Sequence, residues 1–350
     1  MTDTPRPGDA LDEATDVFLA HRELLFSLVY NMLGSVADTE DVLQDAWLAW
    51  SARRGAFTQE DGEAGERREP RAAGDPRAPG ARIANPRAYL VRIAVNLALS
   101  RQSSAARRRE RYVGPWLPEP LVSAAPGALE PAPVTGPAAG DGAEAVERAE
   151  AVSMALLVVL ETLTPLQRAV FVLHDVFGYR HTEIADYLDR TPAAVRQLAR
   201  RAREQVRERR PAHRRTPPRV RREVTERFLA AALGGDLGAL MDLLAPDVTM
   251  WTDGGGRVRQ TVMRPLNGRE KVARFIAGVT ERAPRGVELR YPVVNGDPAA
   301  MLVADGAPFA VMVLELTSDE QQVSEIYTVT NPDKLHPPGK KDTAPGRSTP

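Results

Sequence analysis

The stretch HTEIADYLDRTPAAVRQLAR, residues 181–200, has the pattern of two short helices joined by a tight turn. Asp189 falls at the turn, where a left-handed backbone is needed, and Asp tolerates that conformation better than most residues. Thr191 and Pro192 are typical of a capped helix start, because Thr accepts a backbone hydrogen bond and Pro suits the first helical position. The expected inward faces carry Ile184, Ala185 and Leu188 on the first helix and Val195, Leu198 and Ala202 on the second. These features predict a helix-turn-helix.

The outward face of the second helix is polar and basic. The residues left for that face are Arg196, Gln197, Arg200 and Arg201. Arg pairs well with guanine and Gln with adenine, so a helix that presents them suits the major groove of DNA. The alternative is a pair of surface helices without a nucleic-acid role.

Charge is segregated along the chain, although the net charge of its 350 residues is only −1. Residues 8–50 hold nine Asp and Glu against one Arg, a net of −8. Residues 86–112 hold seven Arg against one Glu, a net of +6, and residues 190–222 hold thirteen Arg against two Glu, a net of +11. Such blocks predict a basic protein partner for the first and a polyanion for the others, unless they are simply solvated faces. The arginines expected to contact phosphates are Arg107, Arg108, Arg109 and Arg111.

Composition excludes several classes of protein. The chain has no cysteine, which rules out structural disulfides and thiolate metal sites. The acidic N-terminus has no secretory signal, and no apolar run approaches the roughly 20 residues of a membrane-spanning helix. We therefore expect a cytoplasmic protein with no membrane partner, no metal and no cofactor.

Stretches rich in Pro, Gly and Ala divide the chain into segments. The expected segments are a helical domain at 14–112 with a disordered low-complexity insertion at 52–84, a flexible linker at 113–143, a second helical domain at 144–210, a short linker at 211–219, an α+β domain at 220–335 and a disordered tail at 336–350. The α+β assignment depends on two amphipathic helices, a further helix near 269–280 and β-like runs at 248–252, 287–294, 299–304, 309–316 and 323–329. This order predicts a curved antiparallel sheet.

A stiff apolar element opens the expected linker. It is YVGPWLPEP, residues 112–120, in which three prolines hold the chain extended. An exposed aromatic residue within polar chain tends to mark a contact site, so Trp116 and Leu117 are the expected anchors. The pattern indicates a strip that lies against another surface.

Residues 14–210 resemble the extracytoplasmic-function group of sigma-70-type sigma factors. The resemblance is carried by YNMLGSVADTEDVLQDAWLAW (30–50) and NPRAYLVRIAVNLALS (85–100) for region 2, and by LETLTPLQRAVFVLHDVFGYRHTEIADYLDRTPAAVRQLARRAR (160–203) for region 4. Residues 220–335 resemble a SnoaL-like domain, which is a nuclear-transport-factor-2-like cone. YVGPWLPEP, DGGGR (253–257) and NPDKL (331–335) are similar to motifs of sigma factors that carry this extension. The implied fold is two all-α sigma domains, a helical bundle and a helix-turn-helix, followed by an α+β cone.

The resemblance implies core RNA polymerase and promoter DNA as partners, and we expect the free chain to be monomeric. The residues implied to dock on core polymerase are Asp38, Glu40, Asp41, Gln44 and Asp45. Asn96 and Arg101 would engage the −10 element, and the second helix of the helix-turn-helix would read the −35 element. The extension would be a built-in regulator that contacts the strip. Its implied residues are Trp116, Leu117, Pro118, Asp253, Gly254, Gly255, Gly256, Arg257, Asn331, Pro332, Asp333, Lys334 and Leu335.

Asp253 is open to three interpretations. A strand followed by Asp-Gly is foremost a turn signal, and the three glycines after it allow another segment to approach closely. SnoaL-like cones can also be enzymes that use an Asp as acid or base. No partnering His or metal-ligand cluster accompanies Asp253, so we expect no catalysis. Whether the cone holds a small ligand is left open.

Three classes of function are compatible with these patterns. The first is a promoter-specificity subunit with its own regulatory domain. The second is a DNA-binding regulator fused to a small-molecule-binding or cyclase-type SnoaL enzyme, and the third is a repressor. The acidic helix disfavours the third, because a repressor has no need to bind core polymerase.

Overall fold

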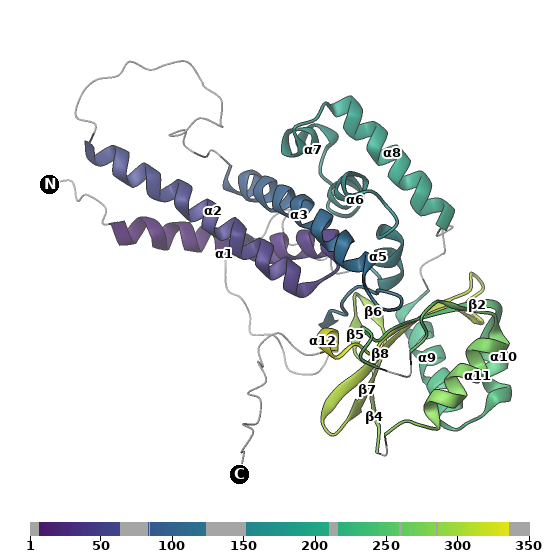
Figure 1. The fold of residues 1–350 in the computed structure, drawn as a ribbon. Helices are drawn as coiled ribbons and strands as arrows, with labels where there is room; N and C mark the ends of the chain where they lie inside the picture. Colours follow the sequence, from purple (N-terminus) through teal and green to yellow (C-terminus); the bar gives the residue numbers. More distant parts are fainter. Residues whose placement is uncertain are drawn as a thin grey trace, which may run out of the picture. The chain divides into compact units, whose positions relative to one another are not determined.

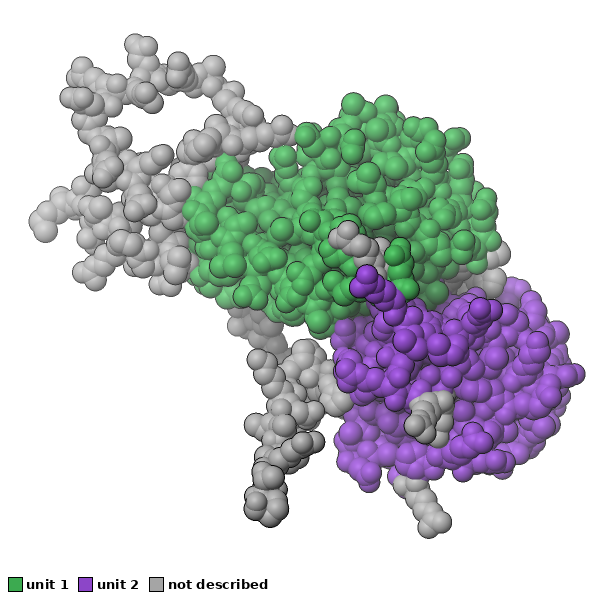
Figure 2. Space-filling view, viewed as in Figure 1, with its two compact units in different colours: residues 1–110, 130–152, 156–212 green, residues 111–129, 153–155, 213–350 purple. Residues whose placement is uncertain are grey.

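The computed structural model describes residues 7–63, 83, 85–123, 152–209, 216–258, 261–284 and 286–335. The chain divides into two compact units, which are coloured separately in Figure 2. Unit 1 comprises residues 1–110, 130–152 and 156–212, and unit 2 comprises residues 111–129, 153–155 and 213–350. The YVGPWLPEP strip therefore belongs to unit 2.

Three long helices pack together in the first part of unit 1 (Figure 1). They are α1 (Pro7–Leu33), α2 (Val36–Glu63) and α3 (Pro86–Glu110). Gly34 ends α1 with a φ of 69°, a conformation that suits glycine. The fully buried side chains that join these helices include Leu25, Leu28, Met32, Leu90 and Ala94. Trp50 is also fully buried, and its indole N–H donates to the carbonyl of Ala14 at 2.8 Å, so it is a core aromatic residue.

The structure continues α2 to Glu63, so the expected low-complexity insertion begins later than residue 52. Residues 52–63 contain Ala, Arg, Gln and Glu, which favour helix strongly enough to outweigh two glycines. Residues 64–82 and 84 lie outside the described residues, as do 124–151, 210–215 and the expected tail at 336–350.

The second part of unit 1 contains the helix-turn-helix. Its elements are α5 (Met154–Leu160), α6 (Pro165–Phe171), a π-helical turn (Val172–Val176), α7 (His181–Leu188) and α8 (Pro192–Arg209). Asp189 ends α7 with φ 55° and ψ 50°, the left-handed conformation predicted for the turn. The hydroxyl of Thr191 accepts a hydrogen bond from the Ala194 amide at 3.2 Å, as predicted for a cap. The helix-turn-helix is confirmed.

Side chains from α3 and α6 cap the end of α1. The last carbonyls of a helix have no partner within it and favour cationic groups nearby. The contacts are Arg168 Nε to the Asn31 carbonyl at 3.0 Å, Gln102 Nε2 to the Met32 carbonyl at 2.5 Å, and the Arg109 guanidinium to the Leu33 carbonyl. These caps join the two helical parts of unit 1.

Unit 2 is built on a curved six-stranded sheet in the order β3-β2-β9-β8-β7-β4 (Figure 1). The strands are β2 (Leu244–Asp253), β3 (Leu266–Asn267), β4 (Glu288–Arg290), β7 (Ala300–Ala304), β8 (Ala307–Leu316) and β9 (Val323–Val329). Helices α9 (Pro218–Leu233), α10 (Leu237–Leu243) and α11 (Arg269–Thr280) pack on it. The core between them includes Phe228, Leu240, Val248, Leu314 and Ile326. The α+β class of this unit is confirmed.

The expected all-antiparallel sheet is wrong for one pair of strands. β2 and β9 run parallel, with Met250 opposite Ile326 and Thr252 opposite Thr328. A hairpin forces antiparallel pairing, but β2 and β9 are separated by a helix and several strands, so their relative direction is not fixed that way.

A small second sheet and a short helix lie outside the sequence expectations. β1 (Val122–Ser123) pairs with β5 (Val293–Val294), which pairs with β6 (Asp297–Pro298). NPDKL forms a helical turn, α12 (Pro332–Leu335), and not merely the end of a strand. Residues 113–123, expected to be flexible linker, are thus fixed in unit 2 by β1 and by contacts described below.

Candidate functional site

The four predicted base-reading residues share one exposed face of α8. Arg196, Gln197, Arg200 and Arg201 are all exposed, whereas Val195, Ala199 and Ala202 are buried. Leu198 was expected to face inward, but it is only partly buried, and the neighbouring Ala199 is buried instead. Arg200 has an ion pair with Glu204 at 3.8 Å, but both side chains are mostly exposed, so the pair contributes little. This face is available to a ligand.

The acidic residues predicted to dock on polymerase contact predicted DNA-binding arginines within unit 1. Asp38 pairs with Arg101 at 3.2 Å and with Arg108 at 2.7 Å. Arg101 also pairs with Asp41, and Glu40 pairs with Arg22 at 2.7 Å. The other two predicted docking residues, Gln44 and Asp45, are exposed. The pairing of the two predicted sites had no signal in the sequence.

Two further predicted DNA-binding residues are engaged inside unit 1. Asn96 Nδ2 donates to the carbonyl of Tyr187, in the first helix of the helix-turn-helix, at 3.0 Å. Arg109 is not an exposed phosphate ligand, because it pairs with Glu161 and caps α1. Burial, assisted by the positive charge of Arg168, lowers the pKa of Arg109 to about 9, which leaves it charged at neutral pH. The side chain of Arg107 lies outside the described residues.

Asp253, at the end of β2, is the centre of a hydrogen-bonded cluster in unit 2, and its side chain is fully buried. Its Oδ1 accepts from the Tyr112 hydroxyl at 2.5 Å and the Gly255 amide at 3.2 Å. Its Oδ2 accepts from the Leu117 amide at 2.8 Å and from Lys334 Nζ at 2.7 Å. The ion pair with Lys334 compensates the buried charge. Asp253, Tyr112, Leu117 and Lys334 are called the Asp253 hub below.

Residues of NPDKL also hold the strip. Lys334 Nζ donates to the Leu117 carbonyl and lies 4.2 Å from the Trp116 ring centroid, a cation–π distance. Asn331 Nδ2 donates to the Tyr112 hydroxyl at 2.8 Å. Burial, followed by the hydrogen bond to Asp253, raises the pKa of Tyr112, so its hydroxyl remains a donor at neutral pH. Leu117 is fully buried, as expected of an anchor, while Trp116 is half-buried.

The glycines of DGGGR allow neighbouring segments to approach closely. A Cβ on Gly255, whose φ is 61°, would lie 2.6 Å from Asn331 Nδ2. A Cβ on Gly256, whose φ is 73°, would lie 2.9 Å from Val113 Cβ in the strip. The close approach predicted from three glycines is confirmed. The turn predicted after Asp253 is also confirmed, since the Arg257 amide donates to the Gly254 carbonyl at 3.0 Å.

The remaining motif residues surround the hub. Arg257 pairs with Asp333 at 3.1 Å, with both side chains mostly exposed. Pro118 and Leu335 are buried, and Pro332 begins α12. Within the described ranges, no group of three His, Asp or Glu side chains is arranged to hold a metal ion. In those same ranges, no helix combines the length and apolar character needed to cross a bilayer.

Similarity to known proteins covers almost the whole chain. Residues 17–64 match the family described as Sigma-70 region 2, and residues 153–206 match Sigma-70, region 4. The ECF RNA polymerase sigma factor SigJ of Mycobacterium tuberculosis is 36% identical over 325 residues, which are 91% of this chain and 92% of that protein. The chain belongs to the extracytoplasmic-function sigma factor family.

Further comparisons agree with this membership. The crystal structure of SigJ from the same organism has a TM-score of 0.61 and 35% identity, and it covers 91% of this sigma factor and 97% of that chain. A probable ECF RNA polymerase sigma factor, SigI of Mycobacterium tuberculosis, is 28% identical over 93% of this chain and 96% of its own length. The sigma factor thus acts in promoter recognition, and its similarity to SigJ covers 91% of the chain, which is more than the two sigma regions alone.

Some contact residues were not predicted from the sequence. Tyr112 stands in the quoted strip, but nothing in the pattern assigned it a partner. Asn295 fixes the end of the strip by accepting from the Leu121 amide at 3.2 Å, and the Asn-Gly pair at 295–296 was a turn signal there. Arg168 could have been suspected, because it is a lone charge in the apolar run PLQRAVFVL (165–173).

Proposed function

We propose that this sigma factor reads the −35 element with the exposed face of α8 and docks on core RNA polymerase with the acidic face of α2. Unit 2 restrains its activity by holding the strip that follows the −10-binding helix α3. The observation that carries this regulation is the Asp253 hub, which ties the strip to both DGGGR and NPDKL. Because its proposed partner is core polymerase, we expect the sigma factor to act in the cytoplasm.

Base reading by α8 predicts a selective loss of transcription. Arg200→Ala and Gln197→Ala should each cost about 1–3 kcal/mol of promoter binding, because each removes a contact to a base edge. The measurement is run-off transcription with core polymerase on a promoter selected from randomised DNA. The matched control is Arg207→Ala, an exposed arginine near the end of the same helix. If this control lost as much activity as Arg200→Ala, the face would act only through general charge.

Restraint by unit 2 predicts that transcription changes when the strip is released. The full chain, a chain ending at residue 209 and the variant Lys334→Ala should give different run-off yields on the same promoter. Asp333→Ala is the control, since Asp333 lies in the same turn but its ion pair with Arg257 is exposed. Equal yields from all four proteins would contradict regulation by unit 2.

An enzymatic role for Asp253 is the alternative to this regulatory one. A general acid or base must reach the substrate, but both oxygens of this carboxylate accept hydrogen bonds from the protein and its side chain is fully buried. These contacts favour a structural role. A cone that binds a molecule without catalysing its reaction is more consistent with these hydrogen bonds than an enzyme is.

A further inference from the structure

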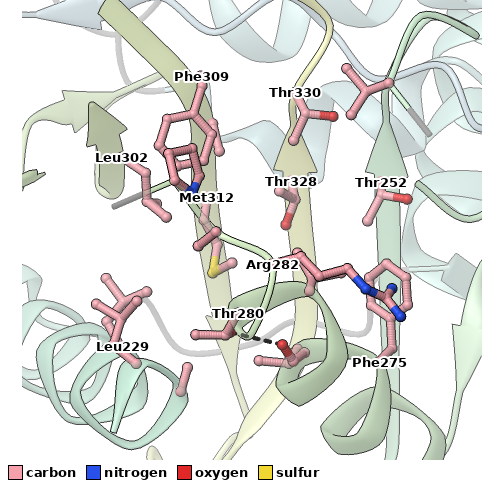
Figure 3. Close-up of a pocket in the computed structure, with 18 of the residues that line it drawn as sticks. Leu229, Thr252, Phe275, Thr280, Arg282, Leu302, Phe309, Met312, Thr328 and Thr330 are labelled. Carbon is pink, nitrogen blue, oxygen red and sulfur yellow. Dashed lines mark hydrogen bonds between the residues drawn. The ribbon is translucent and has the colours of Figure 1, made fainter. Parts of the chain in front are cut away.

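Unit 2 encloses a cavity of about 490 Å³ between its helices and the sheet (Figure 3). The size lies in the range of small-molecule sites. Its walls are predominantly apolar and come from α9, α11 and the inner face of the sheet. They include Leu229, Phe275, Ile276, Leu302, Phe309 and Met312. Water gains few hydrogen bonds in such a space, so an apolar molecule is the better occupant.

One polar group in the wall has no partner. Thr328, on β9, is 6% exposed, and its hydroxyl has no hydrogen-bond partner among the described residues. Its neighbour across the strand pair, Thr252, already accepts from the Val262 amide at 2.8 Å. Figure 3 shows Thr252 on β2 and Thr328 on β9, with Thr330 just after the end of β9, around the same space. A buried hydroxyl without a partner is costly, and an oxygen on a bound molecule would satisfy it.

A second polar group lies at the edge of the cavity. Arg282 follows α11 and lines the cavity, and its exposed guanidinium makes no ion pair with any residue that the structure describes. A carboxylate on a bound molecule could pair with it, whereas a neutral alcohol or phenol would use only Thr328. Both kinds of ligand, acid and neutral, have an apolar body that carries a hydrogen-bonding oxygen.

The cavity also shares a wall with the segment that holds the strip. Pro332 and Leu335 of α12 line the cavity. Asn331 and Lys334, in the same turn of chain, bind Tyr112 and Asp253. α12 is only four residues long, so a shift of its apolar side must also move its polar side.

We propose that this cavity binds a small, mainly apolar molecule that carries a hydrogen-bonding oxygen, and that its occupancy changes how α12 holds the strip. The coupling rests on the proposed regulation by unit 2, but the binding does not. The two can therefore fail separately.

Binding is tested by calorimetry on the full chain with three probes of one shape: 1-naphthol, 1-methylnaphthalene and 1-naphthoate. We expect 1-naphthol to bind one to one, and about two- to tenfold more tightly than 1-methylnaphthalene, the worth of one net hydrogen bond. Thr328→Val keeps the volume and should erase that difference. A tighter fit for 1-naphthoate that Arg282→Gln abolishes would identify an acid, and its absence a neutral ligand.

Two results would overturn the site. One is the lack of saturable one-to-one binding by all three probes. The other is unchanged binding in Ala310→Trp, which fills the cavity, with Thr328→Val showing the same preference for 1-naphthol as the unaltered chain. The coupling is read separately, as hydrogen exchange of the Leu117 amide with and without 1-naphthol. A bound probe that leaves this exchange unchanged would refute the coupling alone.

Discussion

Replacing Asp253 with Ala is expected to lower the free energy of unfolding of unit 2 by about 3–5 kcal/mol, because it leaves a buried cation without its partner. Lys334 is only 11% exposed at its side chain, and it would lose its ion pair. The Tyr112 hydroxyl and the Leu117 amide would lose their acceptor at the same time. Thermal and urea unfolding of the full chain measure the change, followed by a fluorescent reporter placed in unit 2.

The variant Asp253→Asn separates charge from volume. It fills the same space, but it removes the negative charge and turns an N–H₂ group toward at least one existing donor. We therefore expect it to lose nearly as much stability as Asp253→Ala. Asp333→Ala should change stability by less than about 0.5 kcal/mol, since its ion pair is exposed. An Asp253→Asn variant as stable as the unaltered chain would show that the hub does not depend on charge.

The same substitution should release the strip. The Leu117 amide donates to Asp253 and the Leu117 side chain is fully buried, so hydrogen exchange of this amide reports whether the strip is docked. In Asp253→Ala we expect exchange at residues 112–121 to rise more than exchange in the core strand β8, which follows the global stability of the unit. Uniform acceleration across both would mean that the unit unfolds as a whole.

The fold was largely predictable from local signals. Asp189 and Thr191 predicted the helix-turn-helix, because turn and cap chemistry depend on residues close in sequence. The inner strands were predicted by their apolar runs. The parallel pairing of β2 with β9 was not, since it joins segments more than 70 residues apart. The pairing of β1 with β5 was not either, because two-residue strands carry no periodicity.

The candidate site was predictable as motifs but not as contacts. DGGGR, NPDKL and the strip were each recognisable, and the glycines indicated a close approach by some other segment. That Asp253 would meet Tyr112 depends on folding across 141 residues. Arg109 was predicted to contact phosphates because its neighbours are basic, but in the structure it points inward and pairs with Glu161. Charge in a sequence does not tell which members of a cluster point outward.

Arg168→Ala is expected to lower the free energy of unfolding of unit 1 by about 3 kcal/mol, because it leaves a buried carbonyl uncapped and removes one cation from Glu161. Arg168 is 3% exposed, and its Nε donates to the Asn31 carbonyl at the end of α1. Burial lowers its pKa to about 9, so it is charged at neutral pH. Arg168 lies in α6 and its side chain contacts the end of α1, so its loss should also loosen region 4 from region 2.

This loosening can be measured because the chain has no cysteine of its own. Two dyes on Leu19→Cys and Arg207→Cys, both exposed positions, report the distance between regions 2 and 4. Arg203→Ala is the matched control, as Arg203 pairs with Asp175 inside region 4 with its side chain 40% exposed. We expect lower energy transfer in Arg168→Ala and no change in the control.

The functional consequence follows from Asn96. The side-chain amide of Asn96 donates to the Tyr187 carbonyl of region 4, so Asn96 would have to leave that contact to take the role that we propose for it at the −10 element. A looser unit 1 should therefore bind core polymerase and promoter faster, although it unfolds more easily. Arg168→Ala with reduced stability, unchanged energy transfer and unchanged association would mean that this packing stabilises region 4 without holding the sigma factor closed.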